Sequence, residues 1–134
     1  MLGDLKALLV GTALARASRE RLIAWLVATK TGDRRLRAGV PAGWRVGDKT
    51  GSGEHGTTND IGIVWPPGGG AILVAAYLTE TSRDTPACEA VLAGVGRMRW
   101  HEGAMKLLQR LSEDRQYRLS IAHAVAAAVF ACSS

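Results

Sequence analysis

The chain has 134 residues, of which 47% are hydrophobic, and a formal net charge of +5. This length fits one modest globular domain with a small core. No stretch reaches the ~20 consecutive apolar residues that a membrane-spanning helix needs, so we expect no membrane partner.

The positive charge is concentrated in the first third of the chain. Residues 1–39 hold eight lysines and arginines against three acids, most densely in KTGDRRLR at 30–37. A nucleic-acid patch is one interpretation of this cluster. No aromatic residues alternate with the basic ones and no binding motif follows. We therefore favour a solvated helix end with at most one functional arginine, and expect no nucleic-acid partner.

The cysteines and histidines do not form a metal-binding pattern. Cys88 and Cys132 lack Cys-x-x-Cys spacing, and the three histidines are scattered at His55, His101 and His123. We expect no metal and no cofactor. The opening MLGDLKALLVG has an acid inside a short apolar run, a pattern that does not predict an export leader.

Helices are predicted over 4–14 and 18–29, where apolar residues recur at helical spacing. Ser18 is the expected start of the second helix. Residues 34–39 can add one helical turn, and VPAG at 40–43 then breaks the chain into a turn.

Three strands follow, over 44–52, 58–65 and 71–79. The first two alternate between two faces, and the third is a nearly unbroken apolar run, which is typical of a strand buried on both faces. Short connections predict an antiparallel meander. A helix should begin at RDTP, 83–86, and continue to about residue 99 over one face of the sheet.

The last segment, 101–134, has a different composition. It is rich in alanine and predicts a helical tail, and its final part is apolar on all sides. We treat it as a separate unit that either docks on the domain or frays, with a foreign or frame-shifted tail as the alternative. We give the VFAC sequence at 129–132 no functional weight.

The most informative stretch is VGDKTGSGEHG, residues 46–56. It could be a tight turn, a phosphate-binding loop or part of a catalytic wall. A P-loop requires the lysine directly after a glycine and a helix behind it, whereas here Lys49 precedes Gly51 and a strand follows. A hairpin turn explains Gly53 and Gly56 but not a Lys-Thr-Gly sequence inside a strand.

The third interpretation is supported by a resemblance. LRAGVPAGWRVGDKTGSG followed by NDIGIVWPP resembles the Lys-Thr-Gly element of class A serine β-lactamases. Two flanking segments also resemble elements of that family. They are SRERLIAWLVATKTGDRRLRAG, before the Lys-Thr-Gly segment, and AILVAAYLTE with the helix after TSRDTP, behind it. About residues 3–100 match the family's C-terminal portion in order. The resemblance implies an α+β, partial β-lactamase/transpeptidase-like fold over 1–100, with the three-stranded meander flanked by helices.

The resemblance also implies roles for four consecutive residues. Lys49 supplies positive charge near the nucleophile and the substrate carboxylate, and Thr50 donates its hydroxyl to that carboxylate. Gly51 lets the substrate lie close to the strand. The backbone N–H of Ser52 is one of two oxyanion-hole donors, and its hydroxyl can also contact the carboxylate.

A fifth residue is chosen by its position before the strand. Many family members carry an arginine on the next strand, where this chain has Thr58. Members without it often use an arginine upstream, and Arg35 holds that place, so we prefer Arg35 over Arg34 or Arg37 as a carboxylate-binding residue. A merely solvated Arg35 is the alternative.

Other elements of the family do not occur in this sequence. None of the five serines that have a residue three positions later is followed there by lysine. Neither Ser-Asp-Asn nor Glu-x-x-Leu-Asn is present. We therefore expect a truncated homologue that binds a β-lactam antibiotic weakly or not at all and is inactive alone. A non-catalytic module that pairs with a nucleophile-bearing fragment is the alternative.

Two further expectations follow from the resemblance. In the family, two more strands lie beside the segment AILVAAYLT, so here its edge should be exposed and promote self-association. The family acts in the periplasm or after secretion, but the location of this chain as made is not predicted.

Overall fold

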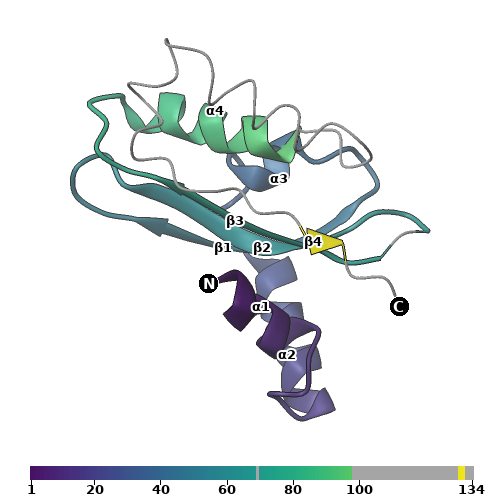
Figure 1. The fold of residues 1–134 in the computed structure, drawn as a ribbon. Helices are drawn as coiled ribbons and strands as arrows, with labels where there is room; N and C mark the ends of the chain where they lie inside the picture. The colour runs from purple at the N-terminus through teal and green to yellow at the C-terminus, as the bar shows by residue number, and fades with distance from the viewer. Residues whose placement is uncertain (69, 98–129, 132–134) are drawn as a thin grey trace.

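The computed structural model describes residues 1–68, 70–97 and 130–131, which form an antiparallel sheet between two layers of helices (Figure 1). The elements in chain order are α1 Leu2–Leu9, α2 Arg16–Ala28, α3 Leu36–Gly39, β1 Arg45–Ser52, β2 Thr58–Trp65, β3 Ile72–Leu78, α4 Thr85–Gly96 and β4 Phe130–Ala131. No helix within the described residues is both long and apolar enough to cross a membrane.

The three long strands form the predicted antiparallel meander. Strands β1 and β2 pair from Arg45↔Trp65 to Ser52↔Thr58, and β2 pairs with β3 over seven positions. The sheet order is β1-β2-β3-β4, so β1 lies at one edge. The α+β fold class is confirmed, and every predicted strand lies within one residue of its observed bounds.

A short fourth strand lies on the far edge of the meander. β4 pairs with the first two residues of β3, as Ile72↔Ala131 and Leu73↔Phe130. It comes from the segment 101–134, for which a helical tail was predicted. The rest of that segment lies outside the described residues.

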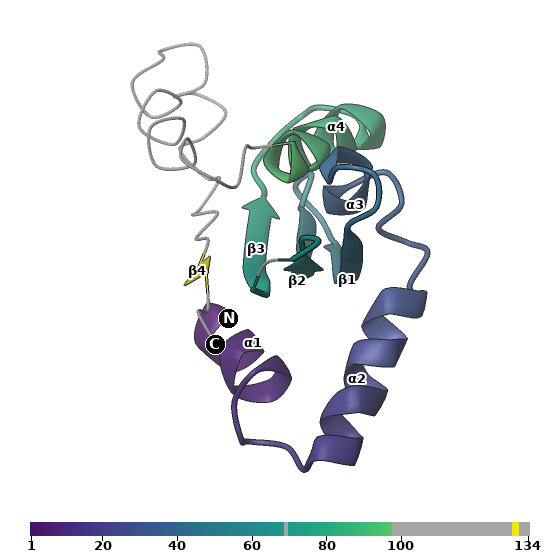
Figure 2. The same ribbon diagram turned by 90° about the vertical axis from the view of Figure 1, so that its right-hand side faces the viewer.

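The two helical layers cover opposite faces of the sheet. α1 and α2 lie on one face, and α3 and α4 on the other (Figure 2). Each layer has its own apolar cluster, and β3 contributes to both, through Leu73 on the α1 side and Val74 on the α4 side. The prediction that this strand is buried on both faces is confirmed, since Leu73 and Val74 are only 2% and 0% exposed.

The predicted bounds of the first two helices are wrong. α1 ends at Leu9 rather than at residue 14, because the N–H groups of Val10 and Gly11 both donate to Lys6 O and close the helix there. α2 begins before Ser18, at Arg16. Its N-cap is Ala15, whose extended backbone turns the chain into the helix without any side-chain cap.

The last helix is capped as expected. Asp84 accepts a 3.0 Å hydrogen bond from the backbone N–H of Ala87, and Pro86 lies in the first turn. Not all of its apolar residues face the sheet, because Val91 is 47% exposed. The buried face includes Gly96, where any side chain would collide with the backbone of α3, so the two helices pack in close contact.

Candidate functional site

Strand β1 presents its residues alternately to the two helical layers. A side chain at Gly47 would contact Leu26 and Val27 of α2, which places the odd-numbered positions, including Lys49 and Gly51, on the α2 face. The even-numbered positions face α3 and α4. Because β1 is the edge strand, the predicted site residues lie at the border of the sheet.

Lys49 and Thr50 lie at the exposed part of this edge. Lys49 is exposed, and its Nζ donates to Thr50 O at 2.6 Å. The Thr50 hydroxyl donates to Thr31 Oγ1 at 2.7 Å, which connects the strand to the loop behind α2. The structure thus presents a cation and a hydroxyl at consecutive positions of the edge strand, on its two opposite faces. Both groups can donate hydrogen bonds to an anionic ligand at this edge.

Arg35 lies next to the same segment but is buried. It is 6% exposed, and its guanidinium donates to Gly51 O, Asn59 O and Ser52 Oγ, each at 2.8 Å. Its Nε lies 3.6 Å from Glu89 Oε1 of α4. The structure therefore brings all five predicted site residues together, while their roles toward a ligand stay predictions.

A second charged group, which the sequence reasoning missed as a site, lies beneath β1. Asp48 and Asp60 are both 0% exposed. Asp48 accepts from Arg37 Nη2, and Asp60 accepts from the Leu36 backbone N–H at 3.0 Å. One oxygen of each carboxylate is buried without a hydrogen-bond partner among the described residues. Residues 35–37 thus fix the loop to the sheet through three consecutive positions.

This burial changes the acidity of one carboxyl group. The pKa of Asp60 is raised to about 7, mainly because burial removes the carboxyl group from water and secondly because the charge of Asp48 is nearby. The hydrogen bond from the Leu36 N–H and the charges of Arg35 and Arg37 act in the opposite direction but are weaker. The sequence held one signal for the pair: Asp48 alternates with Val46 on the inward face of β1. Nothing in the sequence indicated which arginine would pair with it.

Glycine in the Lys-Thr-Gly segment is not required by the fold itself. A Cβ on Gly51 would lie 3.7 Å from Asn59 Cβ, an ordinary contact distance. Gly62 differs, because a Cβ there would collide with Gly47 O of the neighbouring strand. A methyl group at Gly51 would therefore fit against Asn59, and its absence lets another molecule approach the strand backbone more closely.

Among residues 1–68 and 70–97, no group of three or more His, Cys, Asp or Glu side chains could hold a metal ion. What the site offers instead is a cation, two hydroxyls and an open strand edge.

Sequence comparison extends the likeness beyond this site. The chain is 48% identical over 92 residues to β-lactamase FAR-1 of Nocardia farcinica and 40% identical over 98 residues to β-lactamase OXY-1 of Klebsiella oxytoca. These matches cover 69% and 73% of this chain but only 29% and 34% of the relatives. The chain therefore spans about a third of the length of the curated relatives it matches.

Structural comparison agrees with the sequence. A solved class A β-lactamase of the last common ancestor of Gram-negative bacteria superimposes with a TM-score of 0.71 at 61% identity, covering 72% of this chain and 37% of that one. The model of the β-lactamase enzyme family matches residues 1–102. The chain belongs to the β-lactamase enzyme family, and its relatives are of class A.

Proposed function

We propose that this chain supplies the carboxylate-binding wall of a class A β-lactam site, and that its 134 residues do not hydrolyse a β-lactam on their own. The observation that carries the proposal is the grouping of Lys49, Thr50 and Ser52 at an open strand edge, with Arg35 bonded to the last of them.

In this proposal each residue has a distinct role toward a β-lactam. Lys49 attracts the substrate carboxylate, and Thr50 and Ser52 donate hydroxyl hydrogens to it. The Ser52 N–H stabilises the oxyanion that forms when the ring carbonyl is attacked, an interaction whose loss typically costs about 2.7–4 kcal/mol. Gly51 leaves room for the ligand against the strand.

The attacking group must come from elsewhere. Acyl transfer in this family uses an activated serine, and these 134 residues hold no Ser-x-x-Lys sequence. Without a nucleophile and its base, the wall binds and orients but does not open the ring.

Turnover of the chromogenic cephalosporin nitrocefin tests this proposal. The purified chain should give no hydrolysis above the uncatalysed rate. Saturable hydrolysis that disappears in Lys49→Ala would overturn the proposal, because it would show a complete active site. Lys6→Ala, an exposed change on α1, is the matched control for loss of one lysine.

A second candidate function, complementation, is favoured by the edge of the sheet. Beyond the two positions paired with β4, the described part of the chain provides no strand that pairs with the outer edge of β3. A polypeptide carrying the Ser-x-x-Lys portion of a class A β-lactamase could complete the sheet there.

Co-expression of the two polypeptides tests complementation. The co-purified pair should hydrolyse nitrocefin, and Lys49→Ala should abolish the gain while Lys6→Ala keeps it. A soluble, co-purified pair without activity would count against this function.

A further inference from the structure

We propose that β4 is an internal cap of the sheet: it pairs within its own chain with the start of β3 and restricts strand pairing by another polypeptide to the rest of that edge. This role of β4 involves no β-lactam and goes beyond the proposed function. The edge concerned is the outer side of β3, opposite to β2, where β4 pairs with Ile72 and Leu73 (Figure 2).

The outer edge of β3 is a surface that favours pairing with another strand. Ile72 and Val74 belong to the apolar cluster on the α4 side of the sheet, and Leu73 belongs to the cluster on the α1 side. Their side chains are thus packed inside the chain, and the backbone N–H and C=O groups of the outer side are what β3 offers to a further strand. An apolar edge strand without a cover is a template for pairing between chains.

The cover that β4 provides is short. Successive residues of an antiparallel strand point their N–H and C=O groups alternately to the two sides, so only one of Ile72 and Leu73 faces β4 and the other faces β2. β4 therefore makes a single hydrogen-bonded pair of residues with β3. A longer strand that pairs along the whole of β3 would form more such pairs and could displace it.

The connectivity of β4 compensates for its shortness. β4 belongs to the same chain as β3, so its pairing is intramolecular and does not weaken on dilution, whereas pairing with a second copy does. The cap is therefore most effective at low protein concentration, where a competing strand is scarce.

The capped end of β3 lies away from the predicted site residues. Through the register of the sheet, Ser52 on β1 pairs with Thr58 on β2, and Thr58 pairs with Leu78 at the end of β3. β4 covers the opposite end of that strand. An incoming segment can therefore begin to pair beside Leu78, in line with the site, and must displace β4 before it occupies the whole edge.

Amide hydrogen exchange of the full 134-residue chain, followed residue by residue by NMR, tests the cap. The double change Phe130→Pro and Ala131→Pro removes it, because proline has no N–H and is not accepted within a ladder. The matched control is Phe130→Val with Ala131→Val, which alters the same two side chains and keeps both N–H groups. Sedimentation velocity measures the self-association of all three proteins.

We expect one of the two amides at Ile72 and Leu73 to respond. The amide that faces β4 should exchange on the order of tenfold faster in the proline variant than in the unchanged chain and the valine control, since it loses a backbone hydrogen bond. The other amide, which faces β2, should keep its rate. In the unchanged chain both rates should be independent of protein concentration. Self-association of the proline variant should be on the order of tenfold tighter, because the whole edge of β3 becomes open.

Three results would overturn the proposal. Equal exchange rates at Ile72 and Leu73 in the proline and valine variants would show that β4 does not protect the edge. Unchanged self-association of a proline variant whose amide does exchange faster would show that β4 does not restrict pairing. Protection in the unchanged chain that disappears on dilution would assign the covering strand to a second copy. This last measurement needs no variant, so it decides the matter even where the proline variant does not fold.

Discussion

The Asp60 carboxylate accepts a 3.0 Å hydrogen bond from the backbone N–H of Leu36, across 24 positions of sequence, and both residues are fully buried. This contact holds the loop that carries Arg35 against the middle strand of the meander. The same carboxyl group has a pKa raised to about 7, chiefly by burial. The position of the site is therefore connected to a group that titrates near neutral pH.

The first prediction concerns the pH dependence of stability. The pKa of Asp60 is about 7 in the folded chain and near 3.8 in the unfolded chain. Between these values the folded state binds more protons, so the free energy of unfolding should fall as pH rises, by a few kcal/mol at about 1.4 kcal/mol per pKa unit. Asp60→Asn, a neutral isostere, should flatten this slope and be the more stable form at pH 8.

Urea unfolding at half-unit pH steps measures this effect. Asp33→Asn makes the same chemical change at a half-exposed carboxylate, and its profile should run parallel to that of the unchanged chain. If Asp60→Asn also runs parallel from pH 4 to pH 8, the raised pKa of Asp60 is contradicted.

The second prediction concerns the buried ion pair between Arg37 and Asp48. Arg37 donates to Asp48, which is 0% exposed, and to the carbonyls of Leu26 and Val27 at the end of α2. Arg37→Leu leaves Asp48 buried without its counter-charge, which typically costs about 3–5 kcal/mol. Joint replacement with Asp48→Asn should recover part of that loss.

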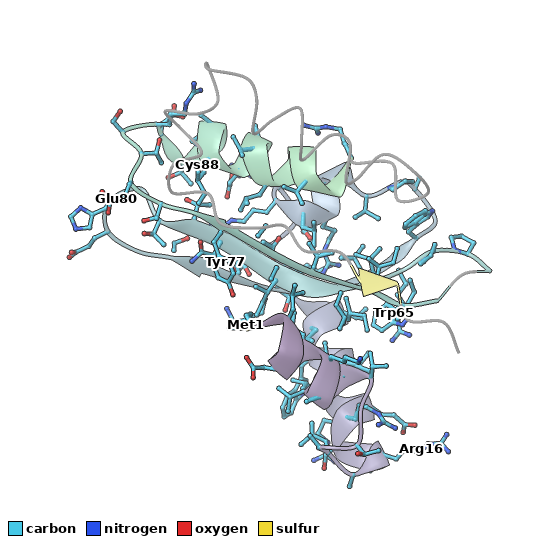
Figure 3. All side chains as sticks on the ribbon, viewed as in Figure 1. Met1, Arg16, Trp65, Tyr77, Glu80 and Cys88 are labelled. Carbon is cyan, nitrogen blue, oxygen red and sulfur yellow. The ribbon has the colours of Figure 1, made fainter. Side chains whose placement is uncertain are left out.

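An exposed pair on the same α2 layer provides the control for this measurement. Arg16 pairs with Glu20 at 2.8 Å at the end of α2 farthest from the sheet (Figure 3). Both side chains are largely exposed, so Arg16→Leu should leave the urea midpoint unchanged. Equal effects of Arg16→Leu and Arg37→Leu would show that burial does not distinguish the two pairs.

Much of the fold and part of the site could be predicted from the sequence because local patterns carry them. Alternation along 44–52 and 58–65 correctly predicted the first two strands of the meander and their two faces. Asp84 before Pro86 correctly predicted the start of α4. The Lys-Thr-Gly segment, residues 49–51, could be found through a family resemblance. These features depend on neighbours in sequence, which a single chain displays.

The rest depends on contacts between distant residues. Arg35, Leu36 and Arg37 reach partners 11 to 24 positions away, and no local pattern pairs them. Ser18 looked like a helix cap, but the chain turns into α2 through the backbone of Ala15 instead. Nothing in the sequence indicated that Arg35 would donate to the backbone carbonyls of Gly51 and Asn59 on two neighbouring strands.

The third prediction separates binding from folding at two glycines. Gly51→Ala should fold with an unchanged melting temperature, because the added methyl group lies at an ordinary distance, 3.7 Å, from Asn59 Cβ. It should still abolish the shift of the Ser52 amide on addition of benzylpenicillin, since the methyl group occupies the path of the ligand. Gly62→Ala, which would collide with Gly47 O, should destabilise the sheet strongly.

The two readouts are the melting temperature from thermal unfolding and the Ser52 amide signal in a titration of the ¹⁵N-serine-labelled chain with benzylpenicillin. A melting temperature of Gly51→Ala lowered as far as that of Gly62→Ala would assign Gly51 to folding. Undiminished ligand binding by Gly51→Ala would refute the close approach of a ligand to this part of β1.

The last prediction concerns association through the outer edge of β3. β4 pairs only with Ile72 and Leu73, and among the described residues no strand pairs with the outer side of the remainder of β3. An apolar strand with unpaired backbone groups promotes pairing between chains. Sedimentation velocity should therefore show association that grows with protein concentration.

Tyr77→Lys should reduce this association, because Tyr77 is only half-buried and a lysine on an edge strand opposes such pairing. Val91→Lys adds the same charge on the exposed side of α4 and should leave association unchanged, since that residue is 47% exposed and lies on a helix. If both variants reduce association equally, net charge rather than the strand edge governs it.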